Sequence, residues 1–127
     1  MLLACIEAGK LELNKTVDAG DGKLTIANHT LEDVTHGRST GVVSIEQIFA
    51  KSSNVGTALI VREVFGSNPQ EYLNYLMKFG YGEQSGIDLS NEPKGKVRSS
   101  VKGSNWSALS LTQMAIGYEV EVTPLQQ

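Results

Sequence analysis

The sequence predicts an α+β fold that is mainly helical, with minor β structure. Two observations predict the helices: capped apolar stripes begin near residues 44 and 68, and the stretch 54–65 is apolar on nearly every side. A third observation predicts the strands, because residues 11–13 and 24–26 alternate apolar and polar side chains on either side of a glycine-rich turn.

The composition is typical of one globular domain. The chain has 127 residues, of which 40% are hydrophobic and 20% charged, and its formal net charge is −3. Nucleic-acid binders usually carry a basic excess, so the charge argues against nucleic acid as a partner. The sequence contains no run of 18 apolar residues, so it predicts no membrane span. The single cysteine, Cys5, excludes an internal disulfide.

The first third of the chain predicts one helix and short strands. Residues 1–8 form a helical pattern that Gly9 ends, with an apolar face made of Leu2, Leu3 and Ile6. The strands at 11–13 and 24–26 are expected to flank the turn at 18–22. Residues 27–43 are polar and predict a loop with one further extended piece.

The remainder predicts five helices. Ser44 with Gln47 makes a capping box whose helix has an apolar stripe of Ile45, Ile48 and Phe49. The buried helix 54–65 ends at Gly66, and Asn68-Pro69 begins a helix that Gly80 ends. Residues 80–105 predict turns. Further capping patterns start at Ser110 with Gln113 and at Thr123 with Gln126.

Both ends of the chain predict a piece of a larger domain. The first helix begins in mid-pattern, and a helix start at Thr123-Pro124-Leu125-Gln126-Gln127 is followed at once by the last residue. The alternative is a frayed polar tail.

Metal and phosphate sites find no support in the sequence. His29 and His36 flank Asp33 in a polar stretch without a third ligand at suitable spacing, so surface histidines are favoured over a metal site. No glycine-rich loop has the P-loop spacing. We expect no cofactor.

Two serine motifs remain. Ser52-Ser53-Asn54 lies between two predicted helices, where a rigid base suits a site. The alternative is structural, with Ser53 or Asn54 as the N-cap of the next helix. Ser99-x-x-Lys102 has the S-x-x-K spacing of serine hydrolases, but Gly103 follows immediately and a helix of useful length does not fit. We interpret this second match as coincidental.

Six further stretches carry a recognisable pattern, and they are IFAKSSNVG (48–56), KFGYG (78–82), SGIDL (85–89), EPKG (92–95), AIGY (115–118) and VTPLQ (122–126). In order and spacing along essentially the whole chain, these stretches resemble class B penicillin-binding proteins, and they look more like the division-specific transpeptidases than the elongation-specific ones. The resemblance implies that the chain is the helical part of a penicillin-binding, serine β-lactamase-like transpeptidase domain. It also implies that residues 1–127 are a partial domain with the S-x-N motif, without the functional S-x-x-K and K-[ST]-G motifs.

The family mechanism then implies roles for two residues. Such enzymes acylate a serine with a stem peptide ending in D-Ala-D-Ala, pass the acyl group to an amine and are trapped by β-lactams. Ser52 matches the S-x-N serine, whose hydroxyl can relay a proton, and Asn54 matches the asparagine, whose amide can bind the substrate carbonyl. Because the nucleophile and its lysine are absent, we expect the chain alone to be inactive.

The resemblance also implies a setting and leaves alternatives open. The parent is expected in the cell envelope, anchored in the bacterial inner membrane with this domain outside the cytoplasm and with division-machinery membrane proteins as partners. The missing core strands lead us to expect exposed apolar surface and self-association. The alternatives are a related S-x-x-K hydrolase, such as a D,D-carboxypeptidase or a β-lactamase-like enzyme, and a non-catalytic helical interaction module.

Overall fold

The computed structural model describes residues 1–127 except 34–38, 89, 104–105, 125 and 127. It has an α+β fold, as predicted. In chain order the elements are α1 (Leu2–Glu7), β1 (Thr16–Asp18), β2 (Lys23–Ile26), β3 (His29–Glu32), β4 (Val42–Ser44), α2 (Ile45–Ala50), α3 (Asn54–Phe65), α4 (Pro69–Lys78) and α5 (Ser110–Ala115). None of the helices in the described part is long and apolar enough to cross a membrane.

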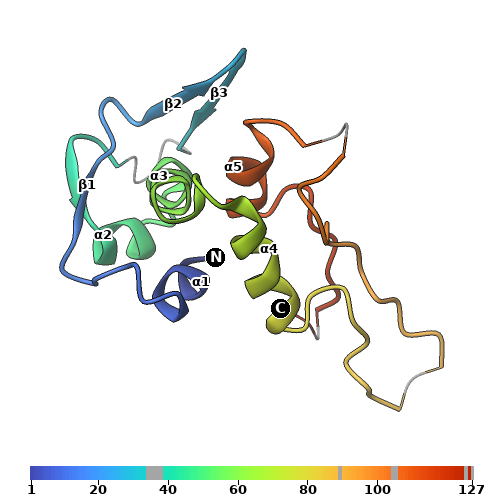
Figure 1. The fold of residues 1–127 in the computed structure, drawn as a ribbon. Coiled ribbons are helices and arrows are strands. Elements are labelled where there is room, and N and C mark those ends of the chain that lie inside the picture. Colours follow the sequence, from blue (N-terminus) through green and yellow to red (C-terminus); the bar gives the residue numbers. More distant parts are fainter. Residues whose placement is uncertain (34–38, 89, 104–105, 125, 127) are drawn as a thin grey trace.

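Helix α3 is the central element. It contacts α1, α2, α4 and α5 and the strands β1 and β3 (Figure 1). Seven of its twelve residues are buried, which confirms the prediction of a helix enclosed on most sides. Fully enclosed neighbours come from α4 and α5, where Tyr72, Leu73, Leu76 and Met114 pack into the same core.

The predicted strand at 11–13 is wrong. Leu11 is buried, but Leu13 is 67% exposed, because a turn closed by the Lys15 N–H to the Glu12 carbonyl (3.0 Å) breaks the alternation. The strand predicted at 24–26 is confirmed as β2.

The strand pairing differs from the prediction of two strands around the turn at 18–22. Strand β2 pairs antiparallel with β3, while β1 pairs antiparallel with β4, so two separate two-stranded sheets form. The stretch 27–43 therefore supplies two extended pieces rather than one. The β1–β4 pair aligns Val17 with Val43, and Val43 is buried beneath it.

Two of the three residues of the predicted apolar face of α1 are exposed, while Leu2 packs partly against the core. The helix ends as expected, with Gly9 at φ +64°. However, Ala4 and Cys5 are its fully buried residues, whereas Leu3 and Ile6 are 54% and 43% exposed. The small side chains let α1 lie close to α3, and the larger ones face outward.

The capping box of α2 is confirmed. The Ser44 N–H donates to Gln47 Oε1 (2.9 Å), and the Gln47 N–H donates to Ser44 Oγ (3.2 Å). Of the predicted apolar stripe of α2, Ile45 and Ile48 are buried, but Phe49 is 76% exposed.

The later helix starts are confirmed in part. Helix α4 begins with Pro69 at its first position, as predicted. Ser110 is not an N-cap but the first residue of α5, and its Oγ accepts from the Ser107 N–H (3.2 Å). At the last predicted start, the Thr123 N–H donates to Gln126 Oε1 (2.9 Å), which is one half of the predicted capping box, and the Gln126 N–H donates to the Thr123 carbonyl (3.0 Å). Leu125 and Gln127, which the predicted helix included, lie outside the described residues.

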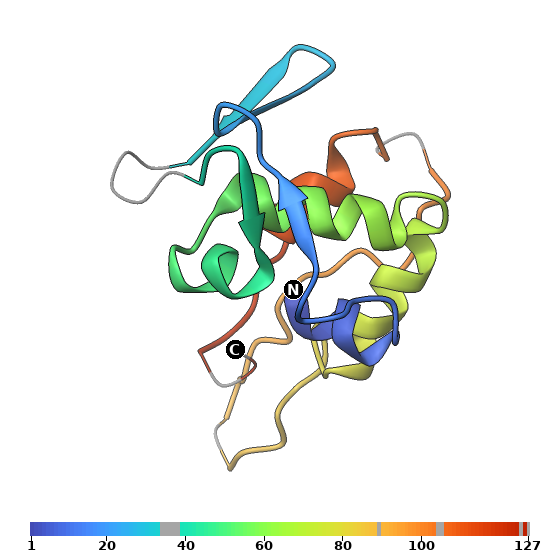
Figure 2. The same ribbon diagram turned by 90° about the vertical axis from the view of Figure 1, so that its left-hand side faces the viewer.

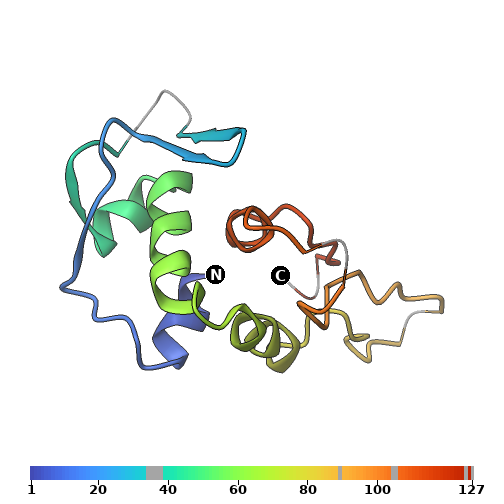
Figure 3. The same cartoon turned by 45° about the horizontal axis from the view of Figure 1, so that its top comes forward.

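The glycine-rich segment after α4 is held by the end of the chain. Figure 2 shows the C-terminal stretch running alongside it, and Lys96 and Glu121 form an isolated antiparallel bridge. The Gln126 amide donates to the carbonyls of Lys94 (2.9 Å) and Glu83. Figure 3 shows α3 and α5 side by side, with the outer loop of this segment projecting on the side of α5 away from α3.

Candidate active site at the junction of α2 and α3

Helices α2 and α3 meet in a tight junction built from backbone hydrogen bonds. The Ser52 N–H donates to the Phe49 carbonyl (3.0 Å) and the Ser53 N–H to the Ile48 carbonyl (2.9 Å), which is the Schellman pattern of helix ends. Ser53 is then the N-cap of α3, since its Oγ accepts from the Gly56 N–H (2.9 Å). One helix therefore ends and the next begins within three residues.

Gly56 allows the two helices to approach this closely. A Cβ atom at this position would lie 2.6 Å from Ile48 Cγ1, closer than real Cβ atoms come, and Ile48 is itself fully buried. The first turn of α3 can therefore rest on α2 only with a residue that has no side chain.

Ser52 occupies an unusual backbone conformation. Its φ of +51° lies in the left-handed region that the Schellman turn requires and that glycine usually fills. A side chain in this region costs about 1–2 kcal/mol. A strained non-glycine residue of this kind points to a role for the side chain that glycine could not fill.

Ser53 faces the interior and binds a carboxylate from a distant segment. Its Oγ donates to Asp33 Oδ2 (2.6 Å), and both residues are buried, at 2% and 6% exposure. The Val55 N–H donates to Asp33 Oδ1 (2.9 Å), and the Ser39 N–H donates to Oδ2 (3.3 Å). The middle residue of the motif is thus a structural cap, as the alternative interpretation of the motif proposed for Ser53.

The side chains of the two predicted site residues, Ser52 and Asn54, do not take part in the hydrogen bonds to Asp33. Ser52 is exposed and Asn54 is half-buried, and neither side chain hydrogen-bonds to another described residue. The Ser52 hydroxyl therefore lies two positions along the chain from the Asn54 amide, and both groups can donate and accept hydrogen bonds. The arrangement can relay a proton and hold a carbonyl, and it holds no nucleophile of its own.

Asp33 is the residue that sequence reasoning missed. It was considered only as a neighbour of His29 and His36, and His36 lies outside the described residues. Twenty residues separate it from Ser53, so no spacing rule connects them. The available signal was general: an acidic residue just after a strand can cap a helix elsewhere.

The S-x-x-K match at Ser99 has no helical geometry. The segment is neither helix nor strand and is fixed to α4, where Gln70 donates to the Ser99 carbonyl (2.8 Å) and accepts from the Val101 N–H (3.0 Å). Without a helical turn Ser99 and Lys102 do not share a face, which confirms that the match is coincidental. Among the described residues, no group of three or more potential metal ligands occurs.

A second acidic side chain organises the glycine-rich segment outside the junction. Glu92 accepts from the N–H groups of Ser85 (2.8 Å) and Gly86 (3.4 Å), and the hydrogen bonds from Ser85 hold the pKa of this carboxyl below its usual value. These residues belong to the stretches 85–89 and 92–95 of the sequence analysis, so the two stretches are one local unit.

The sequence has named relatives. It matches the penicillin binding protein transpeptidase domain over residues 1–127. It is 35% identical over 79 residues to penicillin-binding protein PbpB of Mycobacterium tuberculosis, which is 62% of this chain and 11% of the relative. It is 33% identical over 101 residues to peptidoglycan D,D-transpeptidase FtsI of Buchnera aphidicola, which is 80% of this chain and 16% of the relative. The matched part is therefore only about a tenth to a sixth of those relatives.

Solved structures share the fold. Penicillin binding protein 3 of M. tuberculosis, solved with aztreonam, aligns with a TM-score of 0.78 and 30% identity over 97% of this chain and 26% of its own. The transpeptidase domain of penicillin-binding protein 3 from Burkholderia pseudomallei aligns with a TM-score of 0.82 over 97% of this chain and 34% of its own, and its 22% identity shows the fold alone. With the motif stretches in register and the family match spanning every residue, the chain belongs to the penicillin-binding protein transpeptidase domain family.

Proposed function

We propose that residues 1–127 are part of the transpeptidase domain of a division-type peptidoglycan D,D-transpeptidase, and that Ser52 and Asn54 are its S-x-N motif. The chain would be the helical part of that domain, without the S-x-x-K and K-[ST]-G motifs. The family match and the similarity to the peptidoglycan D,D-transpeptidase FtsI support the reaction class.

One observation supports the site above all others. Ser52 keeps a serine side chain where the turn favours glycine, and it is exposed beside Asn54 at the start of the most buried helix. A purely structural turn would gain stability from glycine at this position. The retained hydroxyl is explained if it takes part in chemistry.

The two residues would act on an acyl transfer centred on a serine outside the chain. The Ser52 hydroxyl would pass a proton between a lysine and the leaving group of a stem peptide ending in D-Ala-D-Ala. The Asn54 amide would donate to the substrate carbonyl and hold the lysine in place. β-Lactams would occupy the same site, and the related penicillin binding protein 3 of M. tuberculosis was solved in complex with aztreonam.

Acylation by a labelled penicillin tests this site in the complete polypeptide that contains residues 1–127. Ser52→Ala and Asn54→Ala are expected to slow acyl-enzyme formation by about 10²- to 10⁴-fold and to leave the unfolding temperature nearly unchanged. Ser99→Ala and Lys102→Ala are matched controls from the coincidental S-x-x-K and should acylate at the wild-type rate.

Three other outcomes would refute parts of the proposal. Unchanged acylation in the Ser52 and Asn54 variants would refute the site. Rapid release of hydrolysed product without transfer to an amine would indicate a carboxypeptidase or a β-lactamase-like enzyme. No adduct with the wild-type polypeptide would favour a non-catalytic helical module. For residues 1–127 alone we expect no adduct in an intact-mass measurement.

The proposed setting is the cell envelope. The relatives are named as penicillin-binding proteins and as a peptidoglycan transpeptidase, which supports a position where peptidoglycan is made. We further propose an anchor in the inner membrane, a domain outside the cytoplasm and contacts with division-machinery membrane proteins. Fractionation of the tagged complete polypeptide, with protease accessibility from outside, tests the position.

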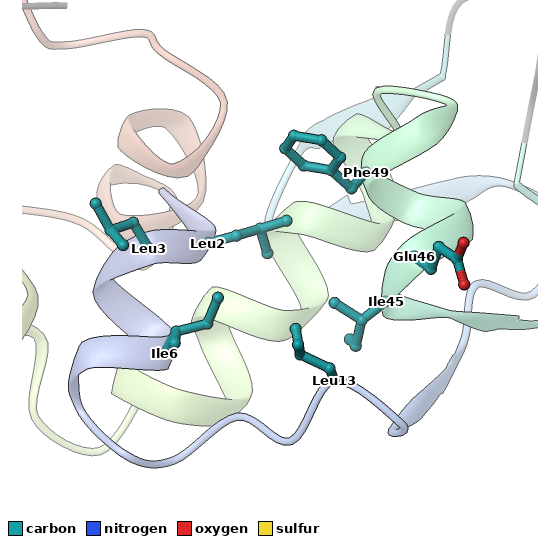
Figure 4. A pocket seen from close by; sticks show the side chains of 7 residues that line it. All are labelled: Leu2, Leu3, Ile6, Leu13, Ile45, Glu46 and Phe49. Carbon is teal, nitrogen blue, oxygen red and sulfur yellow. The ribbon is translucent and has the colours of Figure 1, made fainter.

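The chain alone is proposed to self-associate through an apolar hollow between α1 and α2. Figure 4 shows the side chains around this hollow of ≈ 460 Å³, which are Leu2, Leu3, Ile6, Leu13, Ile45, Glu46 and Phe49. Several of them are largely exposed, and apolar patches of this kind favour association.

Light scattering over a range of concentrations measures this association. Phe49→Asp should shift residues 1–127 toward the monomer, because it places a charge in the hollow. Tyr118→Asp is the matched control, since Tyr118 is 64% exposed and does not line the hollow. A wild-type chain that stays monomeric at all concentrations would refute the proposal.

A further inference from the structure

We propose that Asp33 is a positioning residue of the candidate site. Its carboxylate fixes the short backbone stretch that presents Ser52 and Asn54, so that its loss slows acylation and does more than reduce stability. This inference rests on the proposed function of the site.

The carboxylate is the meeting point of three donors. Oδ1 accepts from the Val55 N–H (2.9 Å), while Oδ2 accepts from the Ser53 hydroxyl (2.6 Å) and the Ser39 N–H (3.3 Å). Asp33 is only 6% exposed, so these protein donors replace most of the water around a charged group. Charge-assisted hydrogen bonds of this length are about twice as strong as neutral ones.

The donors lie on both sides of Asn54. Ser53 precedes it and Val55 follows it, and one carboxylate binds both. The position of the Asn54 Cα atom is therefore set by hydrogen bonds on its two neighbours, and its amide stays free of them. The half-buried Asn54 side chain is thus positioned by a carboxylate to which it does not itself hydrogen-bond.

The same support extends to Ser52. The Ser53 hydroxyl donates to Asp33 and accepts from the Gly56 N–H, while the Ser53 N–H binds the end of α2. Ser53 is therefore held at three points, and Ser52 must bridge from α2 to this fixed residue in the left-handed conformation. If Ser53 were released, Ser52 could relax to an ordinary φ and redirect its hydroxyl.

A carboxylate meets this requirement better than its neutral isostere. Asp33→Asn keeps the shape but offers one carbonyl oxygen, which cannot accept from both Val55 and the pair of donors at Oδ2. In either orientation the new NH₂ group faces a backbone donor, which is the Val55 N–H at the Oδ1 position or the Ser39 N–H at the Oδ2 position. The substitution therefore breaks the support at a defined place and removes no volume.

The experiment measures penicillin acylation and stability together in the complete polypeptide. Asp33→Asn is expected to lower the acylation rate constant at saturating labelled penicillin by about ten- to a hundredfold, the loss that a misplacement of about 1 Å produces. Apparent affinity should fall less. Amide exchange should accelerate at residues 53–56 more than at the C-terminal end of α3.

Two controls separate positioning from structure. Asp18→Asn makes the same chemical change at a carboxylate that accepts from the Gly20 N–H (2.9 Å) in a turn outside the junction, and it should acylate at the wild-type rate. Leu73→Ala reduces stability from within the core of α4. Compared under conditions where each variant is fully folded, Leu73→Ala should keep the wild-type rate constant, whereas Asp33→Asn should not.

Each outcome is informative. A wild-type rate constant in folded Asp33→Asn, with slow Ser52→Ala and Asn54→Ala, would overturn the inference and leave the proposed function standing. Equal slowing in Leu73→Ala would also overturn it. If Asp33→Asn does not fold, Ser53→Ala decides, because it removes one of the three donors and should slow acylation about tenfold. The absence of any wild-type adduct would instead refute the proposed function.

Discussion

The two sides of α2 differ in how completely the chain surrounds them. Toward α3, Ile48 is fully buried, the last carbonyls of α2 accept from Ser52 and Ser53, and Asp33 binds the next residues. Toward α1, an apolar hollow opens beside Phe49, which is 76% exposed. The junction is thus complete within the described residues, while the opposite side presents apolar surface to solvent.

This difference teaches where precision is placed in the chain. Hydrogen bonds with defined geometry fix the α2–α3 junction, and the donor and the acceptor of each of these bonds lie within the chain. The α1–α2 side has only nonspecific apolar contacts, which a range of surfaces could cover. The predictions below compare the two sides through matched substitutions in residues 1–127, followed by the fluorescence of Trp106 or circular dichroism during urea unfolding.

The largest contrast is expected between two phenylalanines. Phe65 is fully buried at the end of α3, and Phe65→Ala should lower the free energy of unfolding by about 3–5 kcal/mol. At concentrations where residues 1–127 are monomeric, Phe49→Ala removes the same atoms from the exposed side of α2 and should change it by less than about 0.5 kcal/mol. Similar losses for the two variants would show that Phe49 is covered in solution.

A smaller loss is expected where α2 and α3 touch. Gly56→Ala should lower the free energy of unfolding by about 1–3 kcal/mol, because the new methyl group meets Ile48 and the overlap exceeds the gain in helix propensity. Combining it with Ile48→Ala should give a loss smaller than the sum of the single variants. Strict additivity in this double-mutant cycle would contradict the close contact.

The strained turn should respond in the opposite direction. Ser52→Gly is expected to raise the free energy of unfolding by about 1 kcal/mol, since glycine adopts φ +51° without a steric penalty. Ser52→Ala keeps the penalty and should give no gain. In the complete polypeptide both variants should lose acylation, so stability and activity would separate at one residue.

The smallest effect concerns Cys5 on the buried side of α1 and appears only in alkaline solution. Burial raises the pKa of its thiol from 9.0 to about 11. Because the folded pKa is the higher one, this contribution to stability is complete below pH 9 and is lost as the pH rises toward 11. Urea midpoints should therefore begin to fall near pH 9 and continue to fall toward pH 11, and Cys5→Ala should flatten the fall. Rapid labelling of native Cys5 by iodoacetamide would contradict its burial.

The sequence predicted those features that depend on neighbouring residues. The Ser44–Gln47 capping box, the Gly9 stop, Pro69 at the start of α4 and the enclosed helix α3 all follow from patterns within a few positions. The location of Ser52 and Asn54 at a helix junction followed from the same local signals. Their catalytic roles stay a prediction.

The sequence could not predict features that depend on distant partners. The β1–β4 pair joins segments separated by two other strands, and the exposed face of α1 depends on which side of it meets α3. Ser110 has the pattern of an N-cap, but its hydroxyl accepts from the Ser107 N–H. Helix α5 therefore begins at Ser110 itself, one residue before the predicted first helical position. Asp33 reaches the junction only through the folded chain, so no local pattern indicated it.

The shortness of the α2–α3 junction has a consequence for how this stretch can change length. The N–H groups of Ser52 and Ser53 donate to carbonyls at fixed positions in α2, and the Ser53 hydroxyl accepts from the N–H of Gly56, three residues further on. One added or deleted residue would therefore break at least one of these hydrogen bonds. A one-residue shift within α3 would also turn its later side chains by about 100° around the helix axis. Insertions and deletions should therefore accumulate in the glycine-rich segment after α4 and avoid residues 48–56.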